Sequence, residues 1–316
     1  MIDAGRQSGG TDQKEGDENR THPRYIGVMT QLRPSTPLLF CFGLGFSAQA
    51  TARAWIAKGG RVAGTVRSAK ELPAEVEPLA FDPTDATTIE RLRDADAILT
   101  SVPPAGDGGD GSGPLDMVLD QFGDQLTTLS PKWVGYLSTT GVYGDVQGAW
   151  VDEASPLLPI SDRSRNRQAA EAAWLALPLP VHLFRLSGIY GPGRGPLAQV
   201  RSGTARRLLK PGHVMNRIHV EDIAGAILAS YEQPQAGAIY NMADNEPAEP
   251  ATVLEYAAKL LGVEPPPALP FDAATLPPMA ASFWAEHKRV SNRKVTEELG
   301  YQLKYPTYRE GLAGCL

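Results

Sequence analysis

Residues 38–67 contain the pattern that most constrains how this chain folds. An apolar run, Leu38–Phe42, predicts a buried strand, and a glycine-containing turn over residues 43–48 follows it. We expect a helix over roughly residues 48–58 and a second strand over residues 61–66. A strand, a Gly-x-Gly-x-x-Ala turn and a helix in this order are typical of parallel α/β sheets that bind a dinucleotide. A coincidental turn is the weaker alternative.

Each residue of this turn has a predicted task. Gly43 would allow a tight bend, Gly45 would let the backbone approach a pyrophosphate, and Ala48 would permit close packing of helix on strand. Phe46 and Ser47 lead into the helix, whose N-terminus would attract phosphates through its unpaired N–H groups and partial positive charge. These five residues therefore form the core of a predicted cofactor site.

The end of the second strand indicates which dinucleotide to expect. Enzymes that bind NAD usually carry an acid about 20 residues after the glycines, but this chain has Gly64-Thr65-Val66-Arg67-Ser68 there. Arg67 would attract a 2′-phosphate, and Thr65 and Ser68 would donate hydrogen bonds to it. We therefore predict NADP as the cofactor, with NAD less favoured. The alternative is that Arg67 is a solvated residue at a strand end.

Composition argues against several classes of protein. The 316 residues carry a net charge of −6, which is unlike a nucleic-acid-binding protein. Two cysteines with no reason to pair fit a reducing compartment, so we expect a cytoplasmic protein. No apolar run reaches the ~18 residues of a membrane span. The first 24 residues are polar and unlike a signal peptide, and the five histidines lack metal-ligand spacing.

Strand-like and helix-like segments alternate after residue 37, which predicts an α/β fold: a Rossmann-type, doubly wound parallel sheet with helices on both faces. Further strands are expected over residues 79–81, 97–102, 133–137, 181–186 and 238–241, and helices over residues 86–94, 114–126, 167–175, 223–231, 251–261 and 292–299. Residues 1–36 lack apolar periodicity and are predicted to be a disordered extension, with Met29 as an alternative start. Residues 263–278 are rich in proline and are expected to form an ordered covering loop, or else a flexible connector.

Four stretches spread over residues 38–316 carry distinctive motifs. They are residues 42–48, Leu137-Ser138-Thr139-Thr140-Gly141-Val142-Tyr143-Gly144, Arg185-Leu186-Ser187-Gly188-Ile189-Tyr190-Gly191-Pro192-Gly193-Arg194 and Arg217-Ile218-His219-Val220-Glu221-Asp222-Ile223-Ala224. Together they resemble the short-chain dehydrogenase/reductase superfamily in its extended and atypical branches. Among its members, the chain is most similar to NAD(P)-dependent epimerase/dehydratase-like proteins.

The resemblance implies places for the ligands. Thr139 stands where the family has the hydroxyl that binds the substrate oxygen, with Thr140 and Tyr143 as further catalytic candidates. The implied cofactor contacts are Asp82 at the adenine edge, Ser101, Val102 and Pro103 along the adenine-side ribose, and Gly188 and Ile189 at the nicotinamide. We expect an NADP-binding Rossmann domain of residues 37–189 and 215–242, and a small C-terminal substrate lobe of residues 190–214 and 243–316.

One departure from the family concerns its Tyr-x-x-x-Lys pair, which normally supplies the proton and binds the nicotinamide ribose. Counting back from Gln168 places Arg163 at the tyrosine position and Arg167 at the lysine position, and residues 150–180 contain no tyrosine. A guanidinium stays protonated, so Arg163 cannot do the acid–base work. Arg167 would still bind a ribose hydroxyl.

Three interpretations of this departure stay open. Tyr143, or the substrate-binding candidate Tyr190, would replace the missing tyrosine. Arg163 and Arg167, which four-residue spacing places on one helix face, would hold a carboxylate or phosphate of the substrate, or else belong to a solvated helix start. Finally, the protein would bind NADP without turnover, as a redox sensor or scaffold.

The substrate end of the motif set also departs from the family. Sugar-nucleotide epimerases place a diphosphate-binding arginine two residues before the position of Arg217, where this chain has Met215. This weakens the case for a nucleotide-sugar substrate. Arg289 is a candidate replacement, and Arg194 is a further substrate-binding candidate. His219 is expected to cap the helix that follows it.

The leading prediction is an NADP-dependent oxidoreductase or epimerase/dehydratase-like enzyme that acts on a hydroxyl or carbonyl group of a small molecule, sugar-derived molecules included. Hydride would move between the nicotinamide and a carbon held near Thr139, and water ordered by Thr139 or Thr140 is one source of the proton. The alternative is a non-catalytic NADP-binding regulator. We expect no nucleic-acid or membrane partner. The resemblance implies a homodimer formed through helices near residues 114–126 and 167–175.

Overall fold

The computed structural model describes residues 36–67, 72–104 and 115–316, and residues 36–316 form one compact unit. Ser68, a predicted cofactor residue, lies outside the described residues, as does the predicted N-terminal extension up to residue 35. Within the described ranges, no helix is long and apolar enough to cross a membrane.

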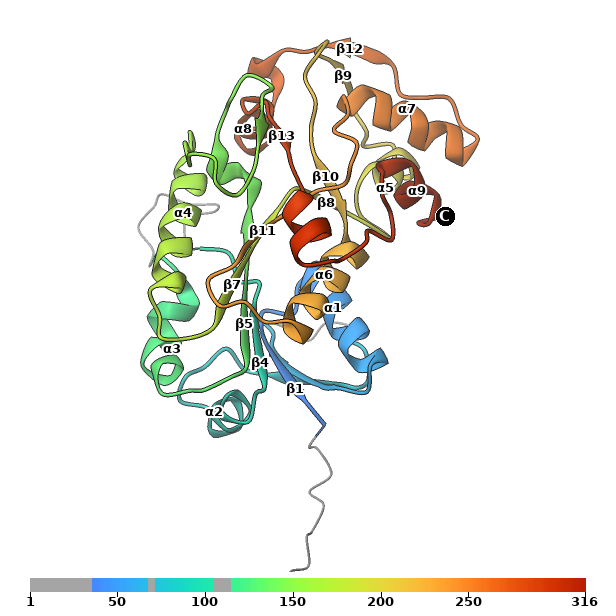
Figure 1. The fold of residues 1–316 in the computed structure, drawn as a ribbon. Coiled ribbons are helices and arrows are strands. Elements are labelled where there is room, and N and C mark those ends of the chain that lie inside the picture. The colour runs from blue at the N-terminus through green and yellow to red at the C-terminus, as the bar shows by residue number, and fades with distance from the viewer. Residues whose placement is uncertain (1–35, 68–71, 105–114) are drawn as a thin grey trace, which may run out of the picture. The chain divides into compact units, whose positions relative to one another are not determined.

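Seven parallel strands form the central sheet, in the order β11-β7-β5-β4-β1-β2-β3 (Figure 1). Their bounds are β1 Leu38–Phe42, β2 Arg61–Thr65, β3 Val76–Leu79, β4 Ala97–Thr100, β5 Trp133–Thr139, β7 Val181–Leu186 and β11 Ile239–Met242. The strand order runs outward from the centre in both directions and reverses between β1 and β4. This is the doubly wound topology that the alternating segments predict.

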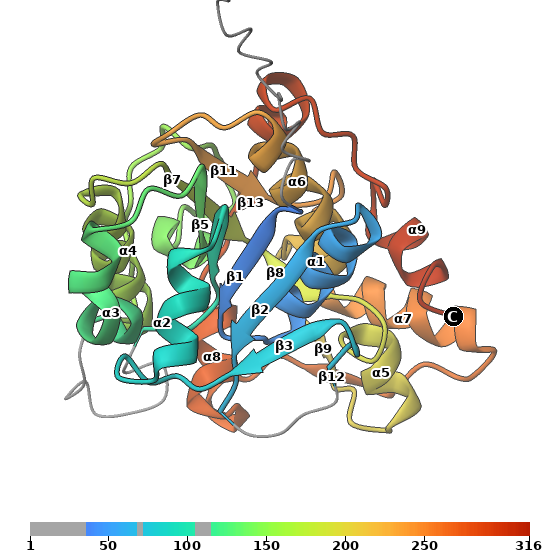
Figure 2. The same cartoon turned by 90° about the horizontal axis from the view of Figure 1, so that it is seen from below.

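Helices cover both faces of this sheet (Figure 2). On one face, α1 (Phe46–Ala57) packs against α6 (Val220–Glu232). The other face is covered by α2 (Ala86–Arg93), α3 (Met117–Thr127) and α4 (Asp162–Leu175). The sheet is therefore buried on both sides, as parallel sheets are.

The residues of β1 show why the chain folds in this way. Leu39 and Cys41 belong to the core that contains α1 and α6. Leu38, Phe40 and Phe42 belong to the core that contains α3 and α4. Alternate residues of a strand point to opposite faces, so a strand that is apolar throughout needs a helical layer on each side.

Smaller elements connect and extend this sheet. They are η1 Thr140–Tyr143, β6 Trp150–Val151, β8 Gly188–Tyr190, α5 Pro196–Arg201, β9 Arg207–Leu209, β10 Arg217–His219, α7 Pro250–Leu261, β12 Ala268–Pro270, η2 Ala273–Thr275, α8 Pro278–Trp284, β13 Arg289–Val290, η3 Lys294–Glu298 and α9 Tyr308–Ala313. Three parallel pairs, β10–β8, β12–β9 and β13–β6, join segments far apart in the chain. In the upper part of Figure 1, α5, α7, α8 and the β9–β12 pair lie beyond the carboxyl edge of the sheet.

Several elements differ from their predicted bounds, among them the third strand, helix α4 and the proline-rich segment. The third strand comes earlier than residues 79–81, and its Pro78 is tolerated because β3 is an edge strand. Helix α4 starts five residues before the predicted 167, because Ser161 caps it by accepting the N–H of Ser164. The proline-rich segment 263–278 is not a plain loop, since it contains β12 and η2.

Candidate active site

A cleft of about 750 Å³ opens at the carboxyl edge of the sheet, where the strand order reverses. Open α/β sheets bind their ligands at this position. Three groups of residues line it: Gly45, Phe46, Ser47 and Ser101 after β1 and β4; Thr139, Thr140, Ser187, Gly188 and Ile189 after β5 and β7; and Phe283, Trp284, Glu286 and Lys288 from α8 to β13. The cleft thus joins the glycine turn to the predicted catalytic hydroxyl.

The glycine turn has the geometry predicted for it. Gly43 has a φ of +79°, and a Cβ atom there would lie 3.1 Å from Val102 Cγ2. By contrast, apart from Gly45 and its two chain neighbours, no described residue has an atom within 4 Å of a Cβ placed on Gly45. Gly45 begins α1, and no side chain of the described residues caps that helix. The guanidinium of Arg194 lies 5.3 Å from the ring of Phe46, which adds a cation beside the same helix end.

Two hydroxyl groups hold the turn in place. Thr65 Oγ1 accepts the N–H of Gly43 at 2.9 Å, and Ser101 Oγ donates to the carbonyl of Gly43 at 2.6 Å. Thr65 is 2 % exposed. The prediction that its hydroxyl binds a 2′-phosphate is therefore wrong, because Thr65 is buried beneath the turn.

The predicted cofactor residues fall into three groups. Gly45, Phe46, Ser47, Ser101, Arg167, Gly188 and Ile189 line the cleft. Gly43, Ala48 and Val102 belong to the turn or pack behind it. Arg67, Asp82 and Pro103 are exposed and lie outside the lining, and the carboxylate of Asp82 accepts two hydrogen bonds from Thr84, which lower its pKa. Contacts of these three residues with a dinucleotide stay a prediction.

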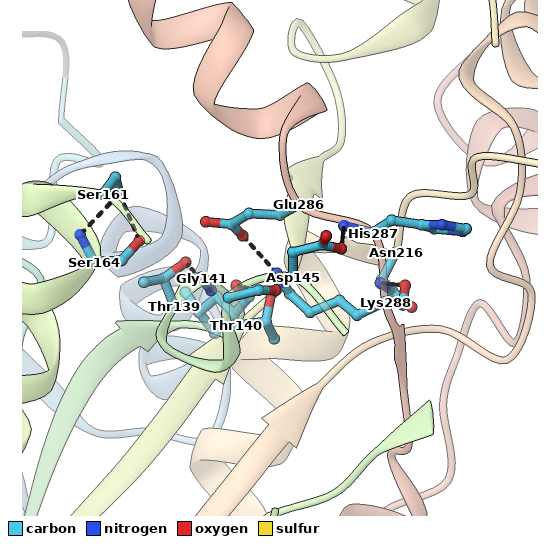
Figure 3. A network of polar contacts seen from close by, with 12 residues as sticks. Thr139, Thr140, Gly141, Asp145, Ser161, Ser164, Asn216, Glu286, His287 and Lys288 are labelled. Carbon is cyan, nitrogen blue, oxygen red and sulfur yellow. Dashed lines mark hydrogen bonds and ion pairs between the residues drawn. The ribbon is translucent and has the colours of Figure 1, made fainter. Parts of the chain in front are cut away.

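The predicted catalytic hydroxyl ends β5. Thr139 Oγ1 accepts the N–H of Gly141 at 3.1 Å and so caps η1. No described residue accepts the hydroxyl proton of Thr139, so it can be donated into the cleft. Thr140 is 7 % exposed and lies 3.4 Å from the carbonyl of Leu186. Figure 3 shows the two threonines side by side.

Tyr143 does not reach the cleft. It is fully buried, and its hydroxyl donates to Asn241 Oδ1 at 2.7 Å and accepts from Arg185 at 2.9 Å. Burial raises the pKa of its phenol above the ordinary value. Tyr143 is thus a buried structural residue in this fold, and we no longer propose it as a catalytic group.

Two predicted substrate-binding residues also lie elsewhere. Tyr190 is 2 % exposed and packs edge-on against the ring of His219, with ring centres 5.2 Å apart. The guanidinium of Arg289 donates to the carbonyl of Gly148. Neither residue lines the cleft, so neither remains a candidate substrate contact.

Arg163 and Arg167 stand at the family's tyrosine and lysine positions, and both line the cleft from helix α4. They lie on one face of the helix, as their four-residue spacing predicts. The guanidinium of Arg163 lies 4.5 Å from the centre of the Phe283 ring in α8. Arg167 Nη1 donates to the carbonyl of Leu137 at 2.9 Å. Arg163 therefore joins α4 to α8 across the cleft, and Arg167 is anchored to β5.

The sequence analysis missed two charged residues of the cleft. Lys288 is 5 % exposed, and its Nζ donates to the carbonyl of Gly144 at 2.9 Å and to Glu286 (Figure 3). Residues two apart in an extended segment point to the same side, which was the available signal for this pair. The same alternation turns Arg289, the residue that the sequence singled out, away from the cleft.

A buried ion pair lies under the floor of the cleft. Arg185 of β7 and Glu171 of α4 are 2.8 Å apart, with side chains 3 % and 4 % exposed. Ser138, next to Thr139, donates to Glu171 at 2.5 Å, and Tyr143 accepts from Arg185. The network fixes the ends of β5 and β7 against α4.

His219 is a structural residue, as the sequence predicts. Nδ1 of His219 accepts the N–H of Glu221 at 3.2 Å, which confirms that His219 caps α6. Burial lowers the pKa of its imidazole to about 4, so the ring is neutral at pH 7 and can accept this bond. Within the described residues, no group of three or more histidine, cysteine or acidic side chains is placed to hold a metal ion.

Comparison with known proteins identifies relatives along nearly the whole chain, although no family model matches it. Protein YeeZ of Escherichia coli K12 is 30 % identical over 277 residues, which cover 84 % of this chain and 94 % of that protein. A functionally unknown conserved protein from Silicibacter pomeroyi is 47 % identical, with a TM-score of 0.79, and 89 % of this chain and 98 % of that chain are covered. A protein provisionally described as an NAD-dependent epimerase/dehydratase, from Methylobacillus flagellatus, is 26 % identical, with a TM-score of 0.66 and coverage of 89 % and 97 %.

The sheet topology, the glycine turn and these relatives define the class of the protein: it belongs to the short-chain dehydrogenase/reductase superfamily. Within that superfamily, the chain belongs to the extended and atypical branch of NAD(P)-dependent epimerase/dehydratase-like proteins, in the same family as E. coli YeeZ.

Proposed function

We propose that the cleft binds NADP and that the protein is an NADP-dependent oxidoreductase or epimerase/dehydratase-like enzyme for a small molecule with a carbonyl or hydroxyl group. One observation carries the proposal: the uncapped start of α1, opened by Gly45, lies in the same cleft as the hydroxyl of Thr139. The description of the Methylobacillus flagellatus relative as NAD-dependent supports a nicotinamide dinucleotide.

The residues present fit such a cofactor. The first turn of α1 and Arg194 would hold the pyrophosphate. Ser187 Oγ is buried, lines the cleft and has no hydrogen-bond partner among the described residues, so it would bind a polar group of the nicotinamide. When bound, the nicotinamide would donate or accept a hydride. We further propose that α5, α7, α8 and the β9–β12 pair belong to the substrate lobe.

Arg67 provides the test of the preference for NADP. The Arg67→Gln variant should raise the dissociation constant for NADPH more than tenfold, or about 1.4 kcal/mol, because it removes the cation for the 2′-phosphate. The constant for NADH should change less than about twofold. Fluorescence titration of both nucleotides measures this, with Arg61→Gln, at the opposite end of β2, as the matched control. An equal loss of affinity for NADPH and NADH would refute the assignment of Arg67 to the 2′-phosphate.

The chemical role proposed for Thr139 follows from its hydrogen bonds. Its oxygen is fixed by the N–H of Gly141, so the hydroxyl proton points to another acceptor. A substrate carbonyl at this place would accept that proton as a hydrogen bond, which polarises its carbon. Arg163 would hold an anionic group of the same substrate.

Replacing Thr139 tests whether this site is catalytic. Thr139→Val should lower kcat by about 100-fold or more while the affinity for NADPH stays unchanged, because the bond to the reacting oxygen is lost, together with the cap of η1, while the glycine turn is untouched. Thr139→Ser, which keeps the hydroxyl and the cap of η1, should retain most of the activity. The assay is NADPH oxidation with a quinone, an aromatic aldehyde and an α-keto ester. Unchanged kcat in Thr139→Val would exclude this role.

A second candidate function is a non-catalytic NADP-binding sensor. The observation that favours it is Arg163 at the position of the family's acid. NADPH binding without oxidation by any carbonyl compound of the panel would support this candidate against the enzyme. For either function we propose a homodimer formed through α3 and α4.

A further inference from the structure

We propose that Lys288 is a catalytic residue of this protein: it donates the proton that the missing tyrosine would otherwise donate to a substrate carbonyl. Glu286 is the positioning residue that holds the ammonium group in the cleft. The proposal rests on the proposed reductase function, since it concerns the proton that accompanies the hydride.

The position of Lys288 carries the inference. It lines the cleft together with Thr139 and Thr140, although its side chain is only 6 % exposed. An ammonium group has three N–H donors. Two of them are used, by the carbonyl of Gly144 and the carboxylate of Glu286. The third donor is therefore available to an oxygen atom bound in the cleft that Lys288 shares with Thr139, and Figure 3 draws both residues.

The backbone around Lys288 is held from both sides. Asn216 Nδ2 donates to the carbonyl of Lys288, and Asn216 Oδ1 accepts the N–H of Val290, both at 2.9 Å. Asp145 Oδ1 accepts the N–H of His287 at 2.9 Å. The backbone carbonyl of His287 accepts the N–H of Gly148 at 2.8 Å. A backbone held in this way fixes the point from which the Lys288 side chain enters the cleft, and a fixed donor needs little reorganisation before it acts.

Other groups of the cleft suit this task less well. Arg163 and Arg167 carry guanidinium groups, which do not give up a proton at accessible pH. Thr139 is a far weaker acid than an ammonium group. Glu286, with a side chain 11 % exposed, connects the ammonium group towards solvent. Lys288 is thus the cleft residue whose chemistry fits a proton donor that is recharged from water.

The proposed step balances as follows. The carbonyl carbon gains a hydride, two electrons and one proton, from a reduced nicotinamide dinucleotide. The π pair of the C=O bond moves to the oxygen, which takes a proton from Lys288 Nζ and becomes a hydroxyl. Lys288 is left as a neutral amine and regains a proton from solvent by way of Glu286. The sum is carbonyl, NADPH and H⁺ giving alcohol and NADP⁺.

Activity measurements give the first test. Lys288→Met should lower kcat at least about 100-fold, the usual contribution of a general acid, with KM and the NADPH dissociation constant within about threefold of wild type. Lys288→Arg should be equally inactive, because arginine keeps the charge and cannot give up a proton. Lys210→Met is the matched control, since Lys210 Nζ donates to the carbonyl of Trp284 but does not line the cleft.

The outcomes separate this proposal from the function on which it rests. A wild-type protein that oxidises NADPH with none of the panel compounds overturns both. If the wild-type protein is active and Lys288→Met or Lys288→Arg has a similar kcat, the assignment of Lys288 as the proton donor is overturned, and the proposed function is not. Loss of kcat in both variants and not in Lys210→Met supports the proposal.

A second test needs no turnover. Wild-type protein without dinucleotide is treated with an amine-acylating succinimidyl ester, and labelling of each lysine is followed by peptide mass spectrometry. Lys288 should be labelled despite its burial, because the cleft reaches Nζ, and labelling should be faster in Glu286→Gln, where the ammonium group has lost its counter-charge. If Lys288 is not labelled in either protein, a small molecule in the cleft does not reach its Nζ, and the proposal is overturned.

Discussion

Replacing Gly45 with valine is expected to abolish NADPH binding and to leave the protein folded. The backbone of Gly45 is extended, with φ of −79°, so valine adopts it without strain. Apart from its two chain neighbours, no described residue has an atom within 4 Å of the new Cβ, so the side chain has room on the cleft side. It would stand where a pyrophosphate must approach the helix end. We expect the dissociation constant to rise at least 100-fold, about 2.7 kcal/mol, with the melting temperature within about 2 °C of wild type.

Gly43→Val is the matched control, and it should behave differently. Gly43 has φ of +79°, and its Cβ would lie 3.1 Å from Val102 and 3.2 Å from Ser101. A β-branched residue there is strained by about 1–3 kcal/mol before any contact is counted. Calorimetry and NADPH titration should therefore show a destabilised protein for Gly43→Val, and a stable protein that does not bind for Gly45→Val. A Gly45→Val protein that binds NADPH normally would show that the dinucleotide does not use this turn.

Replacing Arg185 with methionine is expected to give the largest loss of stability, about 3–5 kcal/mol. The side chain of Glu171 is 4 % exposed, and among the described residues its carboxylate would keep only the hydroxyl of Ser138 as a partner. A buried charge without its counter-ion costs more than the ion pair contributes. Urea unfolding monitored by circular dichroism measures the change.

The double variant Arg185→Met with Glu171→Met provides the control for this prediction. It removes both charges together, so most of the lost stability should return. If the single and double variants are equally stable, the charge of Glu171 is compensated without Arg185. The buried ion pair would then contribute less to the free energy of unfolding than its geometry indicates.

The sequence was sufficient for the fold because the deciding signals are local. The apolar strand Leu38–Phe42 and the glycine turn specify a β–turn–α unit within 20 residues, and repetition of such units leaves few topologies. Thr139 and Gly188 could be placed for the same reason, since Thr139 ends β5, Gly188 follows the end of β7 by two residues, and motif order fixes which strand each belongs with.

The rest of the site depends on contacts between distant segments. Lys288 reaches the cleft because β13 pairs with β6 and Asn216 holds the strand. The two-residue spacing of Glu286 and Lys288 indicates a shared side, but it does not show that this side faces the cleft. Tyr143 was misplaced for the converse reason: its partners Arg185 and Asn241 come from other strands and keep it buried. Long-range pairing therefore decides which charged residues face the ligand.

The most direct measurement of the central claim is an isothermal calorimetric titration of the wild-type protein with NADPH, with Gly45→Val titrated in parallel. The account predicts one site per chain with a low-micromolar dissociation constant in the wild type, and no binding heat in the variant. The absence of binding to the folded wild-type protein would contradict the account, and the arginine-lined part of the cleft would then have to serve another ligand.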